Sequence, residues 1–120
     1  MEAIKQILAA LDYESPLDLD INESITIESE VFMDLTIERV ARTRVSVAHH
    51  YTQRGDLMSD PEIVFDVDGD EWTAIQKTVH PHEFRHCDDG LPGVQRFAGG
   101  MWNSNLERQG FVETAKEMEV

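Results

Sequence analysis

The chain has 120 residues, 41% of them apolar, and carries 24 acidic residues against ten lysines and arginines, a formal net charge of −14. Such a charge repels nucleic acid and anionic lipid, so we expect no direct nucleic-acid binding and no membrane association. The apolar fraction suffices for one hydrophobic core, so residues 1–120 are expected to form a single domain. Because the sequence has no signal-peptide or membrane-span pattern and Cys87 is its only cysteine, we expect a cytoplasmic protein.

The first 40 residues predict one helix followed by extended structure. Apolar residues recur at helical spacing over residues 2–12, which predicts an amphipathic helix that ends at Ser15-Pro16. From Ile21 to Ile37 apolar and polar residues alternate, and a period of two is typical of strands. This stretch predicts either one long strand or two short ones.

Two strands and a turn are predicted in the middle of the chain. Residues 45–51 alternate with Val45, Val47, His49 and Tyr51 on one face of a strand. The sequence QRGD then predicts a turn. Ser59-Asp60-Pro61 predicts a loop, because the residue before a proline favours extended backbone, and residues 63–67 alternate again as a second strand.

A hairpin turn is predicted at Asp68-Gly69, the strongest two-residue hairpin signal in the sequence. The chain is then expected to return as an antiparallel strand over residues 72–79. This turn places Phe65 opposite Trp72, an aromatic pair that would fix the register. The same register sets Asp66 against Glu71, and like charges directly opposite each other destabilise a sheet.

The last third of the chain predicts a loop, a short strand and a helix. Residues 80–93 contain two prolines and two glycines and are expected to form a loop, with residues 94–97 as a short edge strand. A second helix is predicted from Phe97, with Gly110 as its C-terminal cap and residues 113–120 as a frayed tail. The helical spacing of Met101 and Trp102 predicts that both are core residues of this helix rather than a binding surface. The whole pattern predicts an α+β fold, in which a mostly antiparallel β-sheet meander is flanked by an N-terminal and a C-terminal helix.

Residues 66–77 place Asp66, Asp68 and Asp70 like the first ligands of a calcium loop, but the loop pattern fails at its later positions. The sixth position needs glycine and holds Glu71, and the twelfth needs a bidentate acid and holds Lys77. A metal-dependent nuclease centre is disfavoured as well, because the negative charge around it would repel a polyanionic substrate. We therefore expect neither a calcium site nor a nuclease.

The sequence HPHEFRHC gathers four side chains that can bind zinc or copper. Structural zinc sites usually join ligand pairs that are distant in sequence, so a remote ligand such as His49 or His50 would have to complete the set. The alternative is that the histidines are loop residues and that the thiol packs as a small hydrophobe. We expect no cofactor and keep a metal-binding module as an alternative, with these candidate ligands: His80, His82, His86 and Cys87.

No pattern in the sequence supports catalysis. Cys87 lacks the electropositive surroundings of a reactive thiolate, because Asp88 and Asp89 follow it. No serine lies in a nucleophile-elbow context, and no glycine pattern resembles a phosphate-binding loop or a dinucleotide fingerprint. We therefore expect a protein that is not an enzyme.

Two stretches carry a family resemblance. VSVAHHYTQRGDLMSDPEIVFDV, residues 45–67, resembles the signature of an uncharacterised domain family carried by phages, plasmids and integrated elements, in which a Gly-Asp-Leu-Met turn precedes Asp-Pro-Glu and a strand. MWNSNLERQGFV, residues 101–112, resembles that family's closing helix. The resemblance implies a small α+β domain from a mobile element and assigns no biochemistry. It does not lead us to expect the histidine cluster of residues 80–87.

The leading hypothesis is a non-catalytic acidic interaction protein that occupies a basic surface of a nucleic-acid-binding protein. An anti-CRISPR or antirestriction inhibitor that mimics DNA is its sharpest form, because alternate residues of a strand repeat at about 6.8 Å, on the scale of a phosphate backbone. The alternative is an accessory domain whose acidity is a halophilic adaptation. The oligomeric state stays open. The predicted partner-binding residues are Asp56, Asp60, Glu62, Asp66, Asp68, Asp70 and Glu71.

Overall fold

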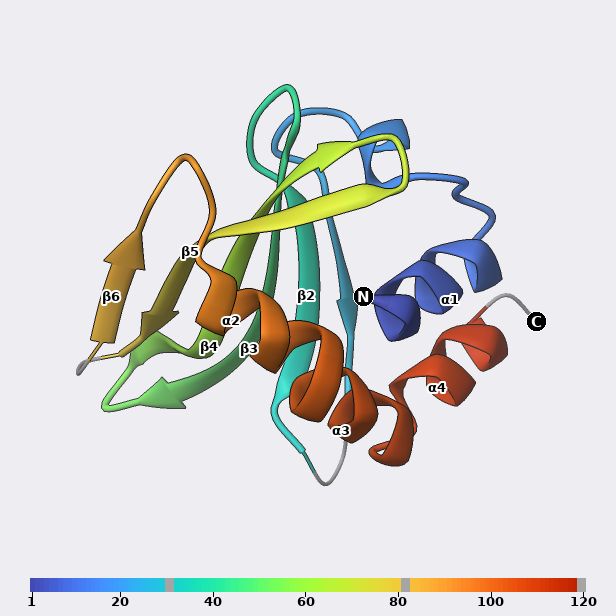
Figure 1. Ribbon diagram of the computed structural model, residues 1–120. Coiled ribbons are helices and arrows are strands. Elements are labelled where there is room, and N and C mark those ends of the chain that lie inside the picture. Colours follow the sequence, from blue (N-terminus) through green and yellow to red (C-terminus); the bar gives the residue numbers. More distant parts are fainter. Residues whose placement is uncertain (30–31, 81–82, 119–120) are drawn as a thin grey trace.

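The computed structural model describes residues 1–29, 32–80 and 83–118. Within these residues one antiparallel sheet has its strands in chain order: β1 (Ser24–Ile27), β2 (Asp34–Arg39), β3 (Arg44–Gln53), β4 (Asp56–Asp68), β5 (Glu71–Val79) and β6 (Glu83–His86). The helical segments are α1 (Glu2–Ala10), the short 3-10 helix η1 (Pro16–Asp18), α2 (Pro92–Phe97), the π-helical η2 (Ala98–Trp102), α3 (Asn103–Arg108) and α4 (Phe111–Met118). The α+β meander flanked by terminal helices is thus confirmed (Figure 1).

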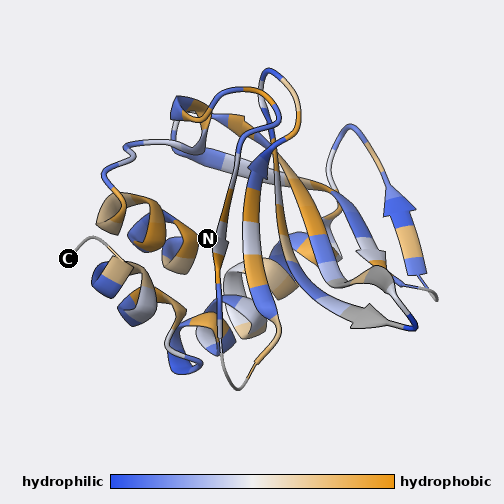
Figure 2. Cartoon of the chain, turned by 180° about the vertical axis from the view of Figure 1, so that it is seen from behind, coloured by the Kyte–Doolittle hydropathy of each residue, from blue (hydrophilic) through white to orange (hydrophobic). Residues whose placement is uncertain are grey.

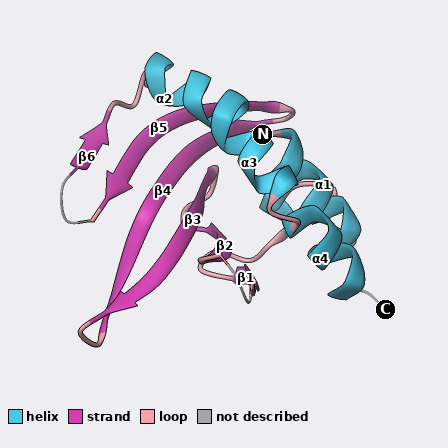
Figure 3. Cartoon of the chain, turned by 90° about the horizontal axis from the view of Figure 1, so that it is seen from below, coloured by secondary structure: helices cyan, strands magenta, loops and turns pink. Residues whose placement is uncertain are grey.

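Side chains alternate across the sheet, and the helices cover one of its faces. Apolar and polar residues follow each other along the strands (Figure 2), and the helices lie along one side of the curved sheet (Figure 3). The covered face is apolar and almost fully shielded from solvent, which gives the fold its core. The strand residues of this face are Ile27, Leu35, Ile37, Val45, Val47, Ile63, Phe65, Val67, Trp72 and Ala74.

The two ends of the chain meet in this core. Helix α1 buries Ile4, Ile7 and Leu8 at the 3.6-residue spacing that the sequence predicts, and it packs against α3 and α4. The Asn103 side chain on α3 accepts a hydrogen bond from the Ala3 backbone N–H at 2.8 Å, which satisfies one of the free amides at the start of α1. The C-terminal segment therefore holds the N-terminal helix in place.

The predicted register of the β4–β5 hairpin is wrong by one residue at the turn. The turn residues are Gly69 and Asp70, and Asp68 pairs with Glu71. Gly69 has a φ of +60°, which suits the first central position of a type II′ turn, whereas a turn at Asp68-Gly69 would need a positive φ at Asp68. A shift of this kind changes the partners by two residues and keeps the same residues on the core face.

The new register changes the two cross-strand pairs that the sequence predicts. Phe65 pairs with Ala74 and Trp72 with Val67, although the Phe65 and Trp72 rings still meet diagonally with centroids 5.5 Å apart. Asp66 lies opposite Thr73 rather than Glu71. The like-charge pair on this hairpin is therefore Asp68 and Glu71.

Residues 59–61 continue strand β4 and do not form the predicted loop. Glu62 pairs with Ala48 and Ser59 with His50, so two residues of β4 lie opposite one residue of β3. This is a β-bulge, and a bulge accommodates a proline because Pro61 has no N–H to donate to a ladder. The QRGD turn is confirmed, with positive φ at Arg54 and Gly55.

The C-terminal third differs most from its prediction. Residues 83–86 form β6 within the predicted loop, and residues 94–97 belong to α2 rather than to an edge strand. Residues 113–118 of the predicted frayed tail belong to helix α4, because Phe111, Val112 and Ala115 are buried in the core; residues 119–120 lie outside the described residues. The extended stretch before residue 40 divides into two strands, β1 and β2, one of the two alternatives that the sequence left open.

Candidate functional site

The antiparallel topology brings acidic residues from four connections to one end of the sheet. In a meander the start of β1, the β2–β3 turn, the β4–β5 turn and the end of β6 lie at the same end of the strands. Figure 1 shows the η1 segment at this end too. We call this region the acidic end. It holds twelve acids: five in residues 11–23, one near the end of β2, four at the β4–β5 turn and two after β6. They are Asp12, Glu14, Asp18, Asp20, Glu23, Glu38, Asp66, Asp68, Asp70, Glu71, Asp88 and Asp89.

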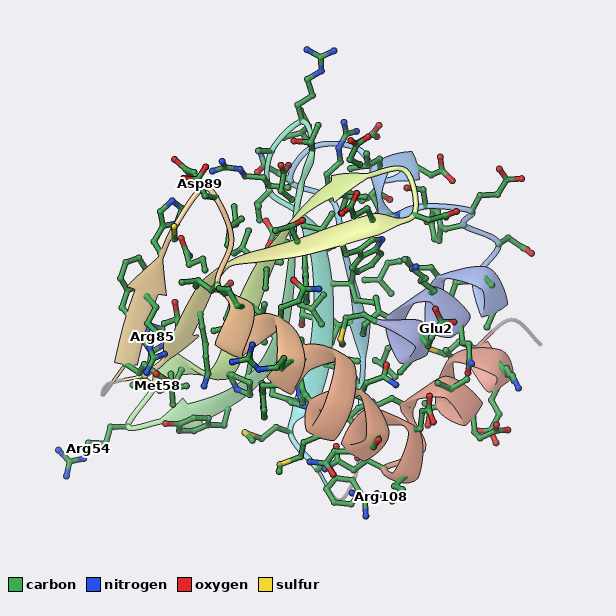
Figure 4. All side chains as sticks on the ribbon, viewed as in Figure 1. Glu2, Arg54, Met58, Arg85, Asp89 and Arg108 are labelled. Atoms are coloured by element: carbon green, nitrogen blue, oxygen red, sulfur yellow. The ribbon has the colours of Figure 1, made fainter. Side chains whose placement is uncertain are left out.

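Most of the cations that reach the acidic end are engaged in structural contacts. Arg39 donates hydrogen bonds to the backbone carbonyls of Leu17 and Leu19, and Lys5 donates to the carbonyl of Asp70. Arg44 pairs with Asp88 at 3.1 Å. Figure 4 places Asp89 at this end and the labelled Arg54 and Arg108 on the opposite side of the molecule. The charge of the protein is therefore unevenly distributed, with its excess of carboxylates at the turns.

The seven predicted partner-binding residues do not form one surface. Asp68, Asp70 and Glu71 are exposed together at the tip of the β4–β5 hairpin. Asp66 accepts a hydrogen bond from the Thr43 hydroxyl at 2.7 Å. Glu62, halfway along β4, accepts one from the Ser46 hydroxyl at 2.7 Å.

The two remaining predicted residues, Asp56 and Asp60, lie in the first half of β4, away from the acidic end, and their side chains fall outside the described residues. Sequence reasoning also missed the acids of residues 11–23 and the pair Asp88 and Asp89. These are far from β4 in the sequence, and only the topology of the sheet makes them its neighbours.

The candidate metal ligands that the structure describes, His80, His86 and Cys87, do not form a metal-binding cluster. His86 on β6 contacts the Gln76 side chain through Nδ1 at 3.1 Å and Asp88 through Nε2 at 2.8 Å. Cys87 follows β6, and its backbone N–H donates to the carbonyl of Ile75. His82 lies outside the described residues. No group of three or more possible ligands occurs within residues 1–29, 32–80 and 83–118.

The contacts of Asp88 shift its titration. The hydrogen bond from the His86 ring holds the pKa of the Asp88 carboxyl below its usual value, and Arg44 acts in the same direction. A hydrogen bond and a nearby positive charge both favour the ionised carboxylate. Asp88 thereby links β6 to the start of β3 across the outer face of the sheet.

Two cavities are relevant to binding. One of about 380 Å³ lies at the acidic end, between the start of β5 and the connection from β6 to α2, and its lining includes Glu71 and Asp89. The other, of about 220 Å³, lies under the sheet where β3 and β4 meet η2 and α3. Trp102, Asn105 and Gln109 line it from the helical side, and His49 and Pro61 line it from the strands. We call this second space the Trp102 cavity.

The Trp102 cavity was not predicted as a site. The helical spacing predicts that both Met101 and Trp102 are buried, and this is confirmed for Trp102 and wrong for Met101, which is 66% exposed. Trp102 is 3% exposed, as its helical spacing predicts, and its ring lies 6.0 Å from that of His49 and 6.1 Å from that of Phe97. The spacing of Trp102, Asn105 and Gln109 along one helix face is visible in the sequence. The strand residues that close the cavity cannot be found in this way, because His49 and Pro61 are 41 to 60 residues away from Trp102, Asn105 and Gln109 in the sequence.

No helix among the described residues is long and apolar enough to cross a membrane. No curated protein and no solved structure matches this chain significantly. A family model, that of the domain of unknown function DUF6908, matches residues 2–98. The match spans α1, the whole sheet and all of α2 and leaves out the closing helix of residues 101–112. Because it covers about four-fifths of the chain, the protein belongs to the DUF6908 family of domains of unknown function.

Proposed function

We propose that this protein is a non-catalytic interaction protein of a mobile genetic element and that its acidic end occupies a basic, nucleic-acid-binding surface of another protein. The observation that carries the proposal is the convergence of twelve acids from four separate connections on one end of the sheet. A partner that binds DNA or RNA offers the complementary positive surface, and a host nuclease of the CRISPR or restriction type is the sharpest form of the proposal.

The hairpin tip of residues 68–71 is the centre of the proposed contact. Asp68, Asp70 and Glu71 are all exposed, and Asp68 faces Glu71 across the ladder, where two negative charges repel each other. A positive group between them would relieve this repulsion, so the tip gains more from a basic partner than an isolated surface acid does. Asp66 contributes less, because the Thr43 hydroxyl already binds its carboxylate.

Uneven charge argues for binding rather than for halophilic adaptation. Adaptation to salt requires only a high total of hydrated acids, and their position on the surface is immaterial to it. An interaction surface requires like charges on one side, where they steer a basic partner and hold it at low ionic strength. The concentration of acids at the turns supports the second account.

The test is a pull-down from host lysate at low and high salt with a matched pair of triple variants. The first variant is Asp68→Asn, Asp70→Asn and Glu71→Gln, which neutralises the hairpin tip. The control is Glu2→Gln, Glu113→Gln and Glu117→Gln, which removes the same number of exposed charges from α1 and α4.

We expect the wild type and the control to retain a nucleic-acid-binding protein at low salt and to lose it at high salt. We expect the tip variant to retain no nucleic-acid-binding protein at either salt concentration. Equal retention by both variants, or a wild type that captures no basic partner, would refute the proposal.

A further inference from the structure

We propose that strand β6 pairs edge to edge with β6 of a second copy of this chain, in an antiparallel arrangement with its two-fold axis at Phe84. β6 is the last strand of the sheet, and among the described residues only β5 pairs with it. Figure 1 shows β6 at the outer side of the molecule. This inference is independent of the proposed function, because it uses the side edge of the sheet and not the acidic end.

The outer edge of β6 carries backbone groups that a further strand can bind. In an antiparallel pair, residues that exchange hydrogen bonds with the neighbouring strand alternate with residues whose N–H and C=O point away from it. The Cys87 N–H, directly after β6, donates to a carbonyl of β5 at 2.8 Å, so Arg85 and Glu83 have the same orientation toward β5. The N–H and C=O of Phe84 and His86 therefore point away from β5, as at the open edge of a sheet.

Phe84 is the most exposed large apolar residue among the described residues, and its backbone is one of these outward-pointing positions. Its exposed fraction is 67%. On a two-fold axis the two copies of Phe84 exchange both backbone hydrogen bonds, as the residues of a hydrogen-bonded antiparallel pair do. Their rings then lie opposite each other on one face of the joined sheet, and aromatic cross-strand pairs stabilise a sheet. A second copy therefore covers apolar surface that is open to water in the single chain.

The charges on either side of Phe84 select this register. Only registers that set outward-pointing residues opposite each other form the ladder, and two of these pair three residues of β6 with the second copy. One is centred on Arg85 and sets two like charges opposite each other, which destabilises a sheet. The other is centred on Phe84 and sets Glu83 of each copy opposite Arg85 of the other. The sequence EFRH of β6 is therefore complementary to itself in this register.

The local charge also favours a second copy at this edge. Within one chain Glu83 forms ion pairs with Lys77 of β5 at 3.2 Å and with Arg85 at 3.0 Å. This group has two cations and one acid, in a chain whose net charge is −14. A second copy meets less repulsion here than at the acidic end. Antiparallel pairing also directs the two acidic ends away from each other.

The pairing is expected to be weak, because each copy contributes one four-residue strand. Stable interfaces bury about 1,200 to 2,000 Å² in total, and smaller ones form transient complexes. We therefore expect a dissociation constant of about 100 μM. Sedimentation velocity at concentrations from about tenfold below to tenfold above this value measures it. The buffer contains about 0.15 M salt, which screens charges that are more than about 8 Å apart.

Two charge-reversed variants test the register. Glu83→Arg makes both charged positions of the pair positive, and Arg85→Glu makes both negative, so each variant alone sets like charges opposite each other twice. In an equimolar mixture, each chain of one variant meets opposite charges on the other. We expect each variant alone to associate at least about tenfold more weakly than the wild type, and the mixture to form a heterodimer with the affinity of the wild type.

A matched pair of serine variants tests the axis. Phe84→Ser removes the exposed ring from β6, and Met101→Ser removes a side chain of η2 that is 66% exposed. We expect Phe84→Ser to weaken association at least about tenfold and Met101→Ser to leave it unchanged. Far-UV circular dichroism checks that each variant is folded. If Glu83→Arg does not fold, because it loses its ion pair with Lys77, the wild type and the two serine variants decide the question.

The inference is overturned by a wild type that stays monomeric at the highest concentration. It is also overturned by a mixture of folded charge variants that associates no better than either variant alone, or by a Phe84→Ser variant that associates as the wild type does.

Discussion

The side-chain amide of Gln95 pairs with the backbone of β5 at Ala74 as a neighbouring strand would. Its Oε1 accepts from the Ala74 N–H at 2.6 Å, and its Nε2 donates to the carbonyl of Trp72 at 2.8 Å. β6 covers only the second half of β5, from Gln76 to Val79. One side chain of α2 therefore completes the edge of the sheet beside Trp72, next to the acidic end.

Replacement of Gln95 by leucine should lower the free energy of unfolding by about 1 kcal/mol, because it removes two part-buried hydrogen bonds to the Ala74 N–H and the Trp72 carbonyl of β5. Urea unfolding measures the change. The same substitution at the exposed Gln6 should stay within about 0.5 kcal/mol of the wild type. If the two variants proved equally stable, the Gln95 contact would contribute nothing to the fold.

Two glycines should respond in opposite directions to alanine. Gly69→Ala should destabilise the protein by about 1 kcal/mol, because the φ of +60° at this turn is strained for a residue with a Cβ. Gly99→Ala should stabilise it by up to about 1 kcal/mol, because Gly99 lies in a helical segment with open space around its Cα. Thermal unfolding of the two variants side by side checks both signs, and a Gly69 variant as stable as the wild type would contradict the turn geometry.

The pair of Asp68 and Glu71 should cost stability in the unbound protein. Asp68→Lys replaces a cross-strand repulsion by an attraction, and we expect a gain of up to about 1 kcal/mol at low salt. The gain should shrink as salt is added, because these side chains are exposed. Urea unfolding at two ionic strengths measures it. A gain that does not depend on salt would show that the effect is not electrostatic.

The pKa of Asp88 should rise toward the usual 3.8 when His86 is replaced by asparagine, and it should rise less in Arg44→Gln, because the His86 hydrogen bond has the larger effect. The sign for stability follows from the lowered pKa of the folded state. The ionised Asp88 carboxylate stabilises the folded state. This stabilisation is complete above the unfolded-state pKa of 3.8 and is lost as the pH falls through the lower pKa of the folded state. Titration of the carboxyl carbon by NMR measures the shift in each variant. A larger rise of the Asp88 pKa in the Arg44 variant would show that Arg44, and not His86, has the larger effect on this pKa.

Strand and helix identity followed from local patterns wherever a pattern was long. Strands β3 and β4 were predicted by the alternation over residues 45–51 and 63–67, and helix α1 by the helical spacing of residues 2–12. Side chains return to the same face every second residue in a strand and every 3.6 residues in a helix, so apolar residues at these spacings identify the element. The observed hairpin turn, at Gly69-Asp70, lies one residue later in the chain than the predicted turn at Asp68-Gly69. The sequence does not distinguish two turn types that both use a glycine and leave the same residues facing the core.

The sequence by itself determined the fold class, the large negative charge and the burial of Trp102, since each depends on composition or on the spacing of near neighbours. The tertiary structure decided which acids lie at one end of the sheet and which residues line one cavity. Asp88 and Asp89 lie near the acids of residues 11–23 only because, in a meander, every second connection lies at the same end of the sheet. Gln109 and Trp102 face His49 and Pro61 only because η2 and α3 pack across β3 and β4. Contacts between segments 40 to 90 residues apart depend on the topology of the sheet, which cannot be predicted from the local periodicity of the sequence.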